Sequence, residues 1–382
     1  MSGAELPVPS GEALQQSAAL VAKICAEIER AGGWLDFARY MERALFAPGL
    51  GYYSGGSTKL GAAGDFITAP ELGRSFGRAL ALTLDAELAA LGANDVLELG
   101  AGSGALAAQV LDSFAKLGRD VRYSILEPSA ELRERQRRAL APFGSRVQWL
   151  DTLPEGSWRG AVVANEVLDA LPVTPFTIDG GEPRALGVVA GAGGFAWGEG
   201  RAKPEFTVAV RALERALGHP LPHGYRSELC LALPAWFRAL GASLARGSLL
   251  LVDYGLVRSD YYHEQRAGGT LVCHYRHRAH TDPFLYPGLQ DITAWVDFSA
   301  CADAASAAGF DVAGFTTQGQ YLLSVLAALP PELAVDLGSP REQSALKTMI
   351  LPGEMGERFK VLLLRKGVSG PTLPGKDFRY RL

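Results

Sequence analysis

The sequence predicts an α/β fold whose parallel sheet is covered by helices on both faces. From residue 93 onward, short apolar segments alternate with helical ones, and this alternation is typical of such a sheet. The first apolar segment, Asp95–Leu99, runs directly into the glycine-rich turn GAGSG and then a helix. Acidic residues accompany three consecutive predicted strands, at the sheet end where open α/β sheets bind ligands.

The composition is that of a globular protein of ordinary polarity. Of its 382 residues, 48% are hydrophobic, so a well-packed core is expected. Lys and Arg together number 37 against 41 Asp and Glu, and the resulting net charge of −4 disfavours a nucleic-acid partner. No apolar run approaches the ~20 residues of a membrane span, so we expect no membrane insertion.

The cysteines and the first residues bear on the cellular compartment. Four cysteines are scattered without a CxxC pair, which favours a reducing environment. The N-terminal sequence has neither the apolar segment of a secretory signal nor the Arg-rich pattern of a transit peptide. We therefore expect a cytoplasmic, bacterial protein, and the sequence makes no prediction of its oligomeric state.

Residues 1–92 are predicted to form an N-terminal helical segment with a glycine-rich lid loop. Helices are expected over 11–31, 35–45 and about 70–91. The loop over 46–71 contains many glycines and aromatic residues, and compact domains seldom carry so long a loop without a function.

Residues 93–382 are predicted to form the main domain. Its strands are expected at 95–99, 122–127, 146–150, 160–164, 248–254, 310–315 and 359–365. Helices are expected at 105–117, 129–140, 205–217, 231–245 and 298–308. The segment at about 175–200 has GG and GAGG turns between short apolar runs, which predicts a β insertion. A long loop, a candidate for substrate binding, is expected over about 257–296.

The glycine-rich turn is the strongest local motif. Its glycines permit a tight turn and let a ligand approach the backbone. The spacing is GxGxG with an acid two residues before the first glycine, whereas a dinucleotide-binding turn reads GxGxxG. This favours S-adenosylmethionine, which has an amino-acid end and no pyrophosphate. The candidate cofactor-binding residues of this motif are Glu98, Gly100, Ala101, Gly102 and Gly104.

Two further acids extend the predicted cofactor site. Glu127 ends the second strand, 127 − 104 = 23 residues after Gly104, where a carboxylate can accept hydrogen bonds from ribose hydroxyls. NAD enzymes use the same arrangement, so Glu127 alone does not distinguish the two cofactors. Asp151 ends the third strand, where its side chain could reach the adenine amino group.

Polar residues also follow the fourth strand, in the segment ANEVLDALPV. One interpretation is structural, with Asn165 capping a helix and with Glu166 and Asp169 in solvent. The other is functional, with all three side chains holding a substrate beside the methyl donor, and Asn165 also touching the cofactor.

Together these motifs resemble one known family, the MidA-type methyltransferases, whose mitochondrial members act as complex I assembly factors. The resemblance covers about residues 35–365. Its motifs are GYY (51–53), GDFITAPE (64–71), ELGAGSG (98–104), ILEP (125–128), ANEVLDALPV (164–173), VDYG (252–255), GTL (269–271), PGLQDITAWVDF (287–298) and the strand FKVLLL. The resemblance implies a Rossmann-like class I methyltransferase sheet that uses S-adenosylmethionine. For the mitochondrial branch it also implies dimethylation of an arginine on a core complex I subunit.

The resemblance also implies roles for residues outside the glycine turn. Asp65 and Glu71, from GDFITAPE, would fold over the site from the lid, and Tyr53 and Asp291 are further candidate substrate contacts. One residue departs from the pattern: Trp295 stands where the family more often has His.

Methyl transfer to arginine would need carboxylates. The attacking atom must lie ~3–3.5 Å from the methyl carbon and in line with the bond that breaks. A guanidinium group stays protonated at neutral pH, because its pKa is above ~12. Glu166 and Asp169 could grip it in a fork and draw positive charge away from the attacking nitrogen, with Glu71 as a third carboxylate.

Other functions remain open at this point. A binding protein could keep the cofactor pocket and act as an assembly chaperone, and a small molecule could be the methyl acceptor. A nicotinamide oxidoreductase is disfavoured by the GxGxG spacing. The residues His274, His277 and His280 have a metal-like spacing, but no completing ligand set accompanies them, and we expect no metal site.

Overall fold

The computed structural model describes residues 6–55, 68–191, 193–200 and 204–382. The chain divides into two compact units. The large unit consists of Ile67–Leu168, Leu233–Val257 and Val296–Leu382, and the small unit of Met1–Phe66, Asp169–Ala232 and Arg258–Trp295. The predicted division after residue 92 follows the chain, whereas each of these units is assembled from three separate segments.

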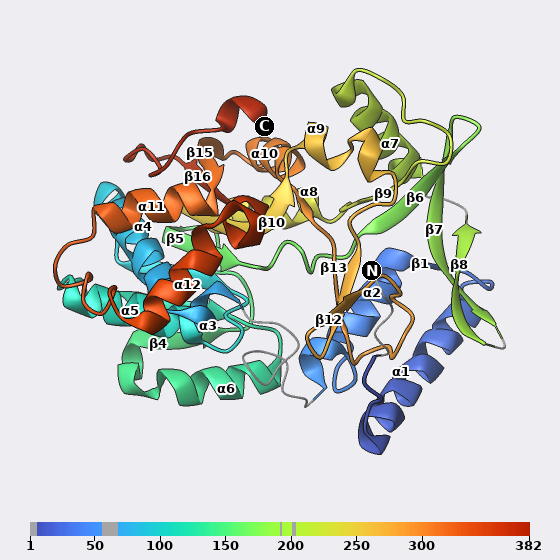
Figure 1. The fold of residues 1–382 in the computed structure, drawn as a ribbon, viewed down its shortest axis with the longest axis horizontal. Helices are drawn as coiled ribbons and strands as arrows, with labels where there is room; N and C mark the ends of the chain where they lie inside the picture. Colours follow the sequence, from blue (N-terminus) through green and yellow to red (C-terminus); the bar gives the residue numbers. More distant parts are fainter. Residues whose placement is uncertain (1–5, 56–67, 192, 201–203) are drawn as a thin grey trace. The chain divides into compact units, whose positions relative to one another are not determined.

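The large unit is built on an eight-stranded sheet (Figure 1). Its strand order is β15-β16-β10-β5-β2-β3-β4, with β14 paired to β10. Neighbouring strands run parallel except at β16, which is antiparallel to both β10 and β15. The strands are β2 (Asp95–Leu99), β3 (Arg122–Leu126), β4 (Val147–Leu150), β5 (Trp158–Asn165), β10 (Leu244–Leu256), β14 (Val296–Asp297), β15 (Asp311–Thr317) and β16 (Phe359–Lys366). The predicted α/β fold class is confirmed.

The order of the strands places a ligand site. From β2 the chain proceeds outward through β3 and β4, and it then returns to the other side of β2 as β5. The sheet therefore has its topological switch point between β2 and β5, where open α/β sheets bind their ligands. The glycine turn follows β2, and Asn165 is the last residue of β5.

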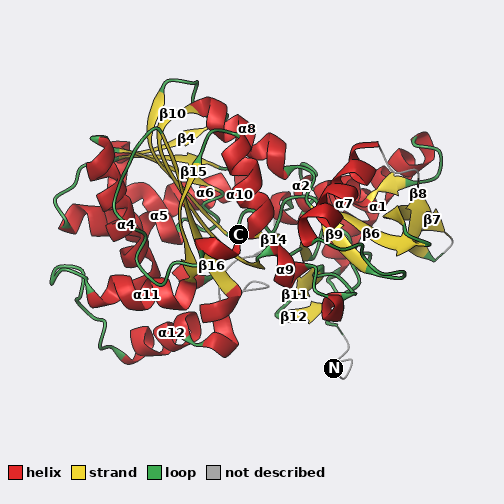
Figure 2. Cartoon of the chain, turned by 90° about the horizontal axis from the view of Figure 1, so that it is seen from above, coloured by secondary structure: helices red, strands yellow, loops and turns green. Residues whose placement is uncertain are grey.

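Helices cover both sides of this sheet, as Figure 2 shows. They are α3 (Ala69–Leu72), α4 (Ser75–Leu91), α5 (Ala105–Lys116), α6 (Ala130–Leu140), α8 (Leu233–Ser243), α10 (Phe298–Ala307), α11 (Gln318–Ala327) and α12 (Pro340–Ile350). Both faces are therefore apolar: consecutive residues of β10 such as Leu250 and Leu251 are each 1% exposed, although they point to opposite faces. The strands accordingly read as continuous apolar runs.

The predicted helix over about 70–91 is two helices, and that expectation was wrong. The chain is extended at Gly73, between α3 and α4. The buried Glu342 carboxylate accepts hydrogen bonds there from the backbone N–H groups of Arg74 (2.7 Å) and Ser75 (3.1 Å). A distant side chain thus caps the start of α4, which local sequence does not predict.

The small unit contains two antiparallel sheets. One has the order β1-β7-β6-β9, with β8 paired to β7, and the other has the order β12-β11-β13. The strands are β1 (Leu35–Asp36), β6 (Thr174–Asp179), β7 (Glu182–Gly191), β8 (Gly194–Gly200), β9 (Arg226–Leu229), β11 (Val272–Tyr275), β12 (Arg278–His280) and β13 (Asp291–Thr293). The predicted β insertion corresponds to β6, β7 and β8. The segment 257–296, predicted as a loop, contains the second sheet.

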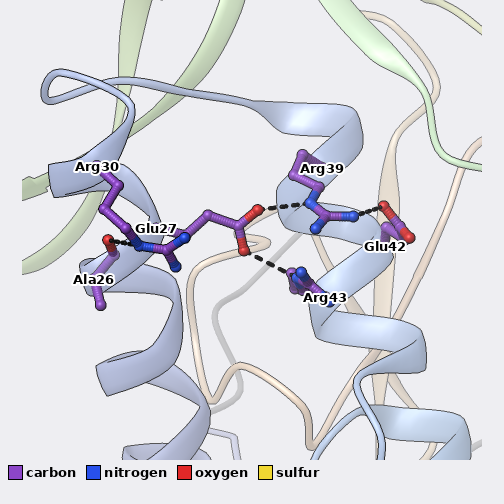
Figure 3. A network of polar contacts seen from close by, with 6 residues as sticks. All are labelled: Ala26, Glu27, Arg30, Arg39, Glu42 and Arg43. Carbon is purple, nitrogen blue, oxygen red and sulfur yellow. Dashed lines mark hydrogen bonds and ion pairs between the residues drawn. The ribbon is translucent and has the colours of Figure 1, made fainter.

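The α-helices of this unit are α1 (Gly11–Arg30), α2 (Phe37–Phe46), α7 (Pro204–Leu217) and α9 (Arg258–Tyr261) among its described residues. Figure 3 shows that Glu27 of α1 bridges to α2: its carboxylate lies 2.7 Å from Nε of Arg39 and 2.9 Å from Nε of Arg43. These pairs are partly exposed, so each adds about 1 kcal/mol at most. Within the described residues, no helix is both long and apolar enough to cross a membrane.

Candidate cofactor and substrate site

The glycine turn has a backbone that other residues adopt with difficulty. Gly100, Gly102 and Gly104 have φ values of 62°, 53° and 83°. A Cβ atom on Gly100 would also lie 3.1 Å from Cγ2 of Val167, which is tighter than ordinary contact. Ala101 is 7% exposed and belongs to the core. The turn therefore requires glycine and anchors itself through Ala101.

Glu98 lies at the base of this turn and is 2% exposed. Burial raises the pKa of its carboxyl group to about 8, while the Tyr123 hydroxyl, which donates to Oε2 at 2.8 Å, opposes this rise. The nearby Glu127 charge raises the pKa further. Glu98 is therefore largely protonated at neutral pH.

Glu127 directly follows β3 and is 3% exposed. Its Oε1 accepts a hydrogen bond from the Ser129 N–H at 3.0 Å, and its Oε2 accepts one from Nε2 of Gln136 at 3.1 Å. Burial raises its pKa, while bonds from Ser129, Gln136 and the Gly102 N–H oppose the rise. A carboxylate has about four acceptor positions, so one remains for a hydroxyl of a ligand.

Gln136 is a residue that the sequence analysis missed. It is fully buried on α6. Its Nε2 also donates to the Gly102 carbonyl at 3.0 Å, and its Oε1 accepts from the Trp149 indole at 2.9 Å. Gln136 thus joins the glycine turn, Glu127 and β4. A signal was present: Leu132, Gln136 and Leu140 follow each other at helical spacing, so the glutamine stands in the apolar stripe of an otherwise charged helix.

Asp151 lies differently from Glu127. Its side chain is 88% exposed and pairs with Nη1 of Arg133 at 2.6 Å. Nη2 of Arg133 donates to the Leu150 carbonyl at 2.8 Å, and its Nε donates to the Glu127 carbonyl. Arg133 therefore joins the ends of β3 and β4, and the predicted contact of Asp151 with adenine stays a prediction.

Asn165 and Glu166 occupy the turn after β5. Glu166 has a φ of 53°, a left-handed conformation that costs a residue with a side chain about 1–2 kcal/mol. Its N–H donates to the Val252 carbonyl at 2.9 Å, and the Asn165 amide donates to its Oε1 at 3.1 Å. Such strain is frequent at functional sites. The structure thus places this acid at the switch point of the sheet.

Glu71, on α3, approaches the glycine turn. Its carboxylate accepts a hydrogen bond from Ser103, and burial raises its pKa, while Ser103 and the Arg135 charge oppose the rise. The other carboxylate atom, Oε2, is buried without a hydrogen-bond partner among the described residues. This oxygen is an acceptor that a ligand could satisfy.

Three predicted residues belong to the small unit. The Tyr53 hydroxyl donates to Oδ1 of Asp291 at 3.0 Å. Burial raises the pKa of Tyr53 well above its ordinary value, and the charges of Asp291 and Asp169 add to the rise. Tyr53, Asp169 and Asp291 therefore lie close together. The chain passes between the units after Leu168, so Glu166 and Asp169 are in different units. Asp65 lies outside the described residues.

Trp295 is packed within the small unit. The backbone N–H of Trp295 donates to Oγ1 of Thr270 at 2.9 Å, and the Arg266 guanidinium lies 5.4 Å from the centre of the Trp295 ring. A tryptophan cannot transfer protons as a histidine does, so this position takes no part in proton transfer here. His274 and His280 lie on β11 and β12, and among the described residues no three His, Cys, Asp or Glu side chains form a metal-binding group.

The strand order, the glycine turn after the central strand and the buried acids beside it define a class I S-adenosylmethionine-dependent methyltransferase. A family model described as "Putative S-adenosyl-L-methionine-dependent methyltransferase" matches residues 79–316. The chain belongs to this family, the MidA-type methyltransferases, as its motifs predict.

Solved structures and curated proteins agree with this assignment. A crystal structure of a Burkholderia thailandensis protein bound to S-adenosyl-homocysteine is 44% identical, with a TM-score of 0.90, over 99% of this chain and 100% of that one. The protein arginine methyltransferase NDUFAF7 homolog of Drosophila melanogaster is 28% identical over 97% of this chain and 90% of its own length. Protein arginine methyltransferase NDUFAF7 of Homo sapiens is 27% identical over 87% of this chain and 80% of its own length.

S-adenosylmethionine is therefore the cofactor, and the residues present fit it. The three glycines adopt the left-handed backbone of the turn. Glu71 of α3 reaches this turn through its hydrogen bond from Ser103, and its unpartnered Oε2 is a buried acceptor for a ligand.

Proposed function

We propose that the protein methylates an arginine side chain of a protein substrate, and that a respiratory complex I core subunit is the substrate. The observation that carries the proposal is Glu166, an acid held in a strained conformation at the switch point of a methyltransferase sheet. The relatives named protein arginine methyltransferases, at 25–28% identity, support the same acceptor. We further propose that the protein acts in a bacterial cytoplasm, which its four scattered cysteines favour.

In this proposal the large unit binds the cofactor. Gly100, Gly102 and Gly104 form the turn that holds it, Glu127 accepts a ribose hydroxyl and Asp151 contacts adenine. Bound there, S-adenosylmethionine supplies an electrophilic methyl group. Glu98 supports the turn from below as a neutral acid, since burial raises its pKa to about 8.

Other acids are assigned to bind the positively charged guanidinium group of the acceptor. Glu166, in the large unit, holds the guanidinium group and fixes its plane, because paired N–H groups match a carboxylate. Asn165 orients Glu166 through the bond at 3.1 Å. As the methyl carbon bonds to the attacking nitrogen, the bond between that carbon and the sulfonium sulfur would break and leave S-adenosylhomocysteine. Glu71, whose pKa burial raises, is the group we assign to accept the proton that the nitrogen loses. Within the small unit, we assign further substrate contacts to Tyr53, Asp169 and Asp291, together with Asp65.

The Glu166→Gln variant tests this assignment. We expect it to bind S-adenosylhomocysteine as the wild type does and to transfer methyl groups at least ~100-fold more slowly, because it loses a charge aimed at the reacting group. Transfer is measured with methyl-labelled S-adenosylmethionine and extract from cells that lack the protein, followed by mass spectrometry of methylated arginines. Glu134→Gln, on the exposed face of α6, is the matched control.

The outcomes separate the alternatives. Label on arginine that requires Glu166 supports the proposal. Label confined to small molecules would replace the protein acceptor, and cofactor binding without any transfer would favour a non-catalytic assembly chaperone. Unchanged transfer by Glu166→Gln would refute the role of this residue.

A further inference from the structure

Asp253 is a buried acid near the carboxyl end of β10. It is 1% exposed. Its Oδ2 accepts hydrogen bonds from the N–H groups of Val167 at 3.2 Å and Leu168 at 2.9 Å. Its Oδ1 accepts from the N–H of Tyr254 at 2.9 Å. Both oxygens therefore act as acceptors for backbone donors.

These bonds hold the turn that carries Glu166. The N–H of Glu166 donates to the Val252 carbonyl at 2.9 Å, so two consecutive residues of β10 bind three consecutive amides after β5. Glu166 has a φ of 53°, and its neighbours must be fixed for such a conformation to persist. Asp253 supplies two of the three bonds that fix them.

The same turn contacts the glycine turn. A Cβ atom added to Gly100 would lie only 3.1 Å from Cγ2 of Val167, so the Val167 side chain packs beside Gly100. Val167 therefore does two things: its backbone N–H donates to Asp253, and its side chain packs beside Gly100. Asp253 is thereby linked through Val167 to the cofactor turn and through the adjacent peptide to Glu166.

We propose that Asp253 is a positioning residue for methyl transfer: it fixes the Glu166 turn against the glycine turn without touching the reacting groups. The consequence for transfer rests on the proposed function of Glu166, whereas the positioning itself rests on the hydrogen bonds alone. Only a carboxylate fits, since an asparagine must turn its NH₂ group toward at least one of the backbone N–H donors.

The test compares Asp253→Asn with the wild type by three measurements. We expect hydrogen exchange at the amides of Val167 and Leu168 to quicken at least ~10-fold, because their acceptor is lost or weakened. Transfer in the arginine assay above should fall ~10- to 100-fold, as expected for a misplaced reacting group. Affinity for S-adenosylhomocysteine, measured by calorimetry, should stay within about threefold, because the glycine turn itself is intact.

Glu87→Gln is the matched control. Glu87 is also a buried acid of the large unit, but it pairs with Arg365, which lies opposite Ser248 in the sheet, whereas Asp253 lies opposite Lys360 at the other end of β10. Loss of the Glu87–Arg365 ion pair should lower the free energy of unfolding but leave the hydrogen bonds of the Glu166 turn unchanged. We expect exchange at Val167 and Leu168, transfer and affinity all to match the wild type in folded protein.

The results decide between distinct failures. Unchanged exchange at both amides in Asp253→Asn would overturn the positioning role, and so would a parallel loss of transfer in Glu87→Gln. If Asp253→Asn exchanges faster but even the wild type transfers no methyl group, the positioning role of Asp253 stands and the proposed function is refuted. If Asp253→Asn does not fold, Asp253→Glu, which displaces both oxygens by one methylene, is expected to change exchange and transfer in the same direction.

Discussion

Buried acids concentrate at the carboxyl ends of the strands of the large unit. Glu98, Glu127 and Asp253 are each at most 3% exposed, and each accepts hydrogen bonds from donors in its own unit. A buried carboxyl group is stable only if it is hydrogen-bonded or protonated, and this unit uses both solutions. Glu98 takes the proton, whereas Asp253 takes three backbone donors.

The protonation of Glu98 makes folding stability depend on pH. Its pKa of about 8 in the folded chain exceeds the ordinary value of 4.5, so between these values the folded state binds one more proton than the unfolded state. The free energy of unfolding then falls as pH rises from about 5 to 8, by at most ~1.4 kcal/mol per unit. Glu98→Gln lacks this contribution.

Urea unfolding at pH 5.5, 6.5 and 7.5 measures the effect. We expect the free energy of unfolding of Glu98→Gln to rise relative to that of the wild type at each higher pH. The effects of the other titrating groups cancel when the two proteins are subtracted. Two curves that stay parallel over this range would show that Glu98 is already charged.

Gly100 gives a prediction that separates backbone strain from contact. Gly100→Ala should destabilise the protein and weaken S-adenosylhomocysteine binding at least ~10-fold, because the new Cβ is strained at φ 62° and lies 3.1 Å from Val167. Gly118→Ala is the control: Gly118 has a φ of 68°, but a Cβ there meets nothing within 4 Å. It should cost about 1–2 kcal/mol and leave binding unchanged. Equal affinity in both variants would contradict the prediction.

At the scale of the element, α6 does more than cover the sheet. Arg133 and Gln136, one turn apart, join the ends of β3 and β4 to the glycine turn. One face of a helix thereby fixes three segments of the predicted cofactor site. On the same helix, Arg138 and Glu134 pair with each other at the surface and contribute little.

The Gln136→Glu variant should make the hydrogen bond between residue 136 and Glu127 depend on pH. The new carboxyl group would stand about where Nε2 now lies, 3.1 Å from Oε2 of Glu127, and two acids so close share a proton. We expect affinity for S-adenosylhomocysteine near that of the wild type at pH 6 and at least ~10-fold weaker at pH 8, by calorimetry. Gln148→Glu, whose amide donates to the Ser124 hydroxyl instead, should show no such dependence. A flat profile for Gln136→Glu would show that Glu127 does not depend on this donor.

At the scale of the whole molecule, the sequence predicted what depends on local patterns. Seven strands of the large sheet were recognisable, because strands covered on both faces are apolar runs, whereas β14, with two residues, was missed. Helices α11 and α12 were missed. The strands β12 and β13 were also missed, because strands of three residues carry no detectable periodicity. Gln136 and Asp253 were missed as functional residues, since their partners lie in distant segments that only the fold brings together.

The division into two units has a consequence for how such a protein can change over evolution. In the described part, the chain passes between the units at 168/169, 232/233, 257/258 and 295/296. Two of these junctions lie inside ANEVLDALPV and PGLQDITAWVDF, and a third follows VDYG by two residues. Neither unit is a contiguous cassette that recombination could exchange intact. Any crossover that replaces one unit alone must cut inside these motifs, beside residues proposed to hold the acceptor.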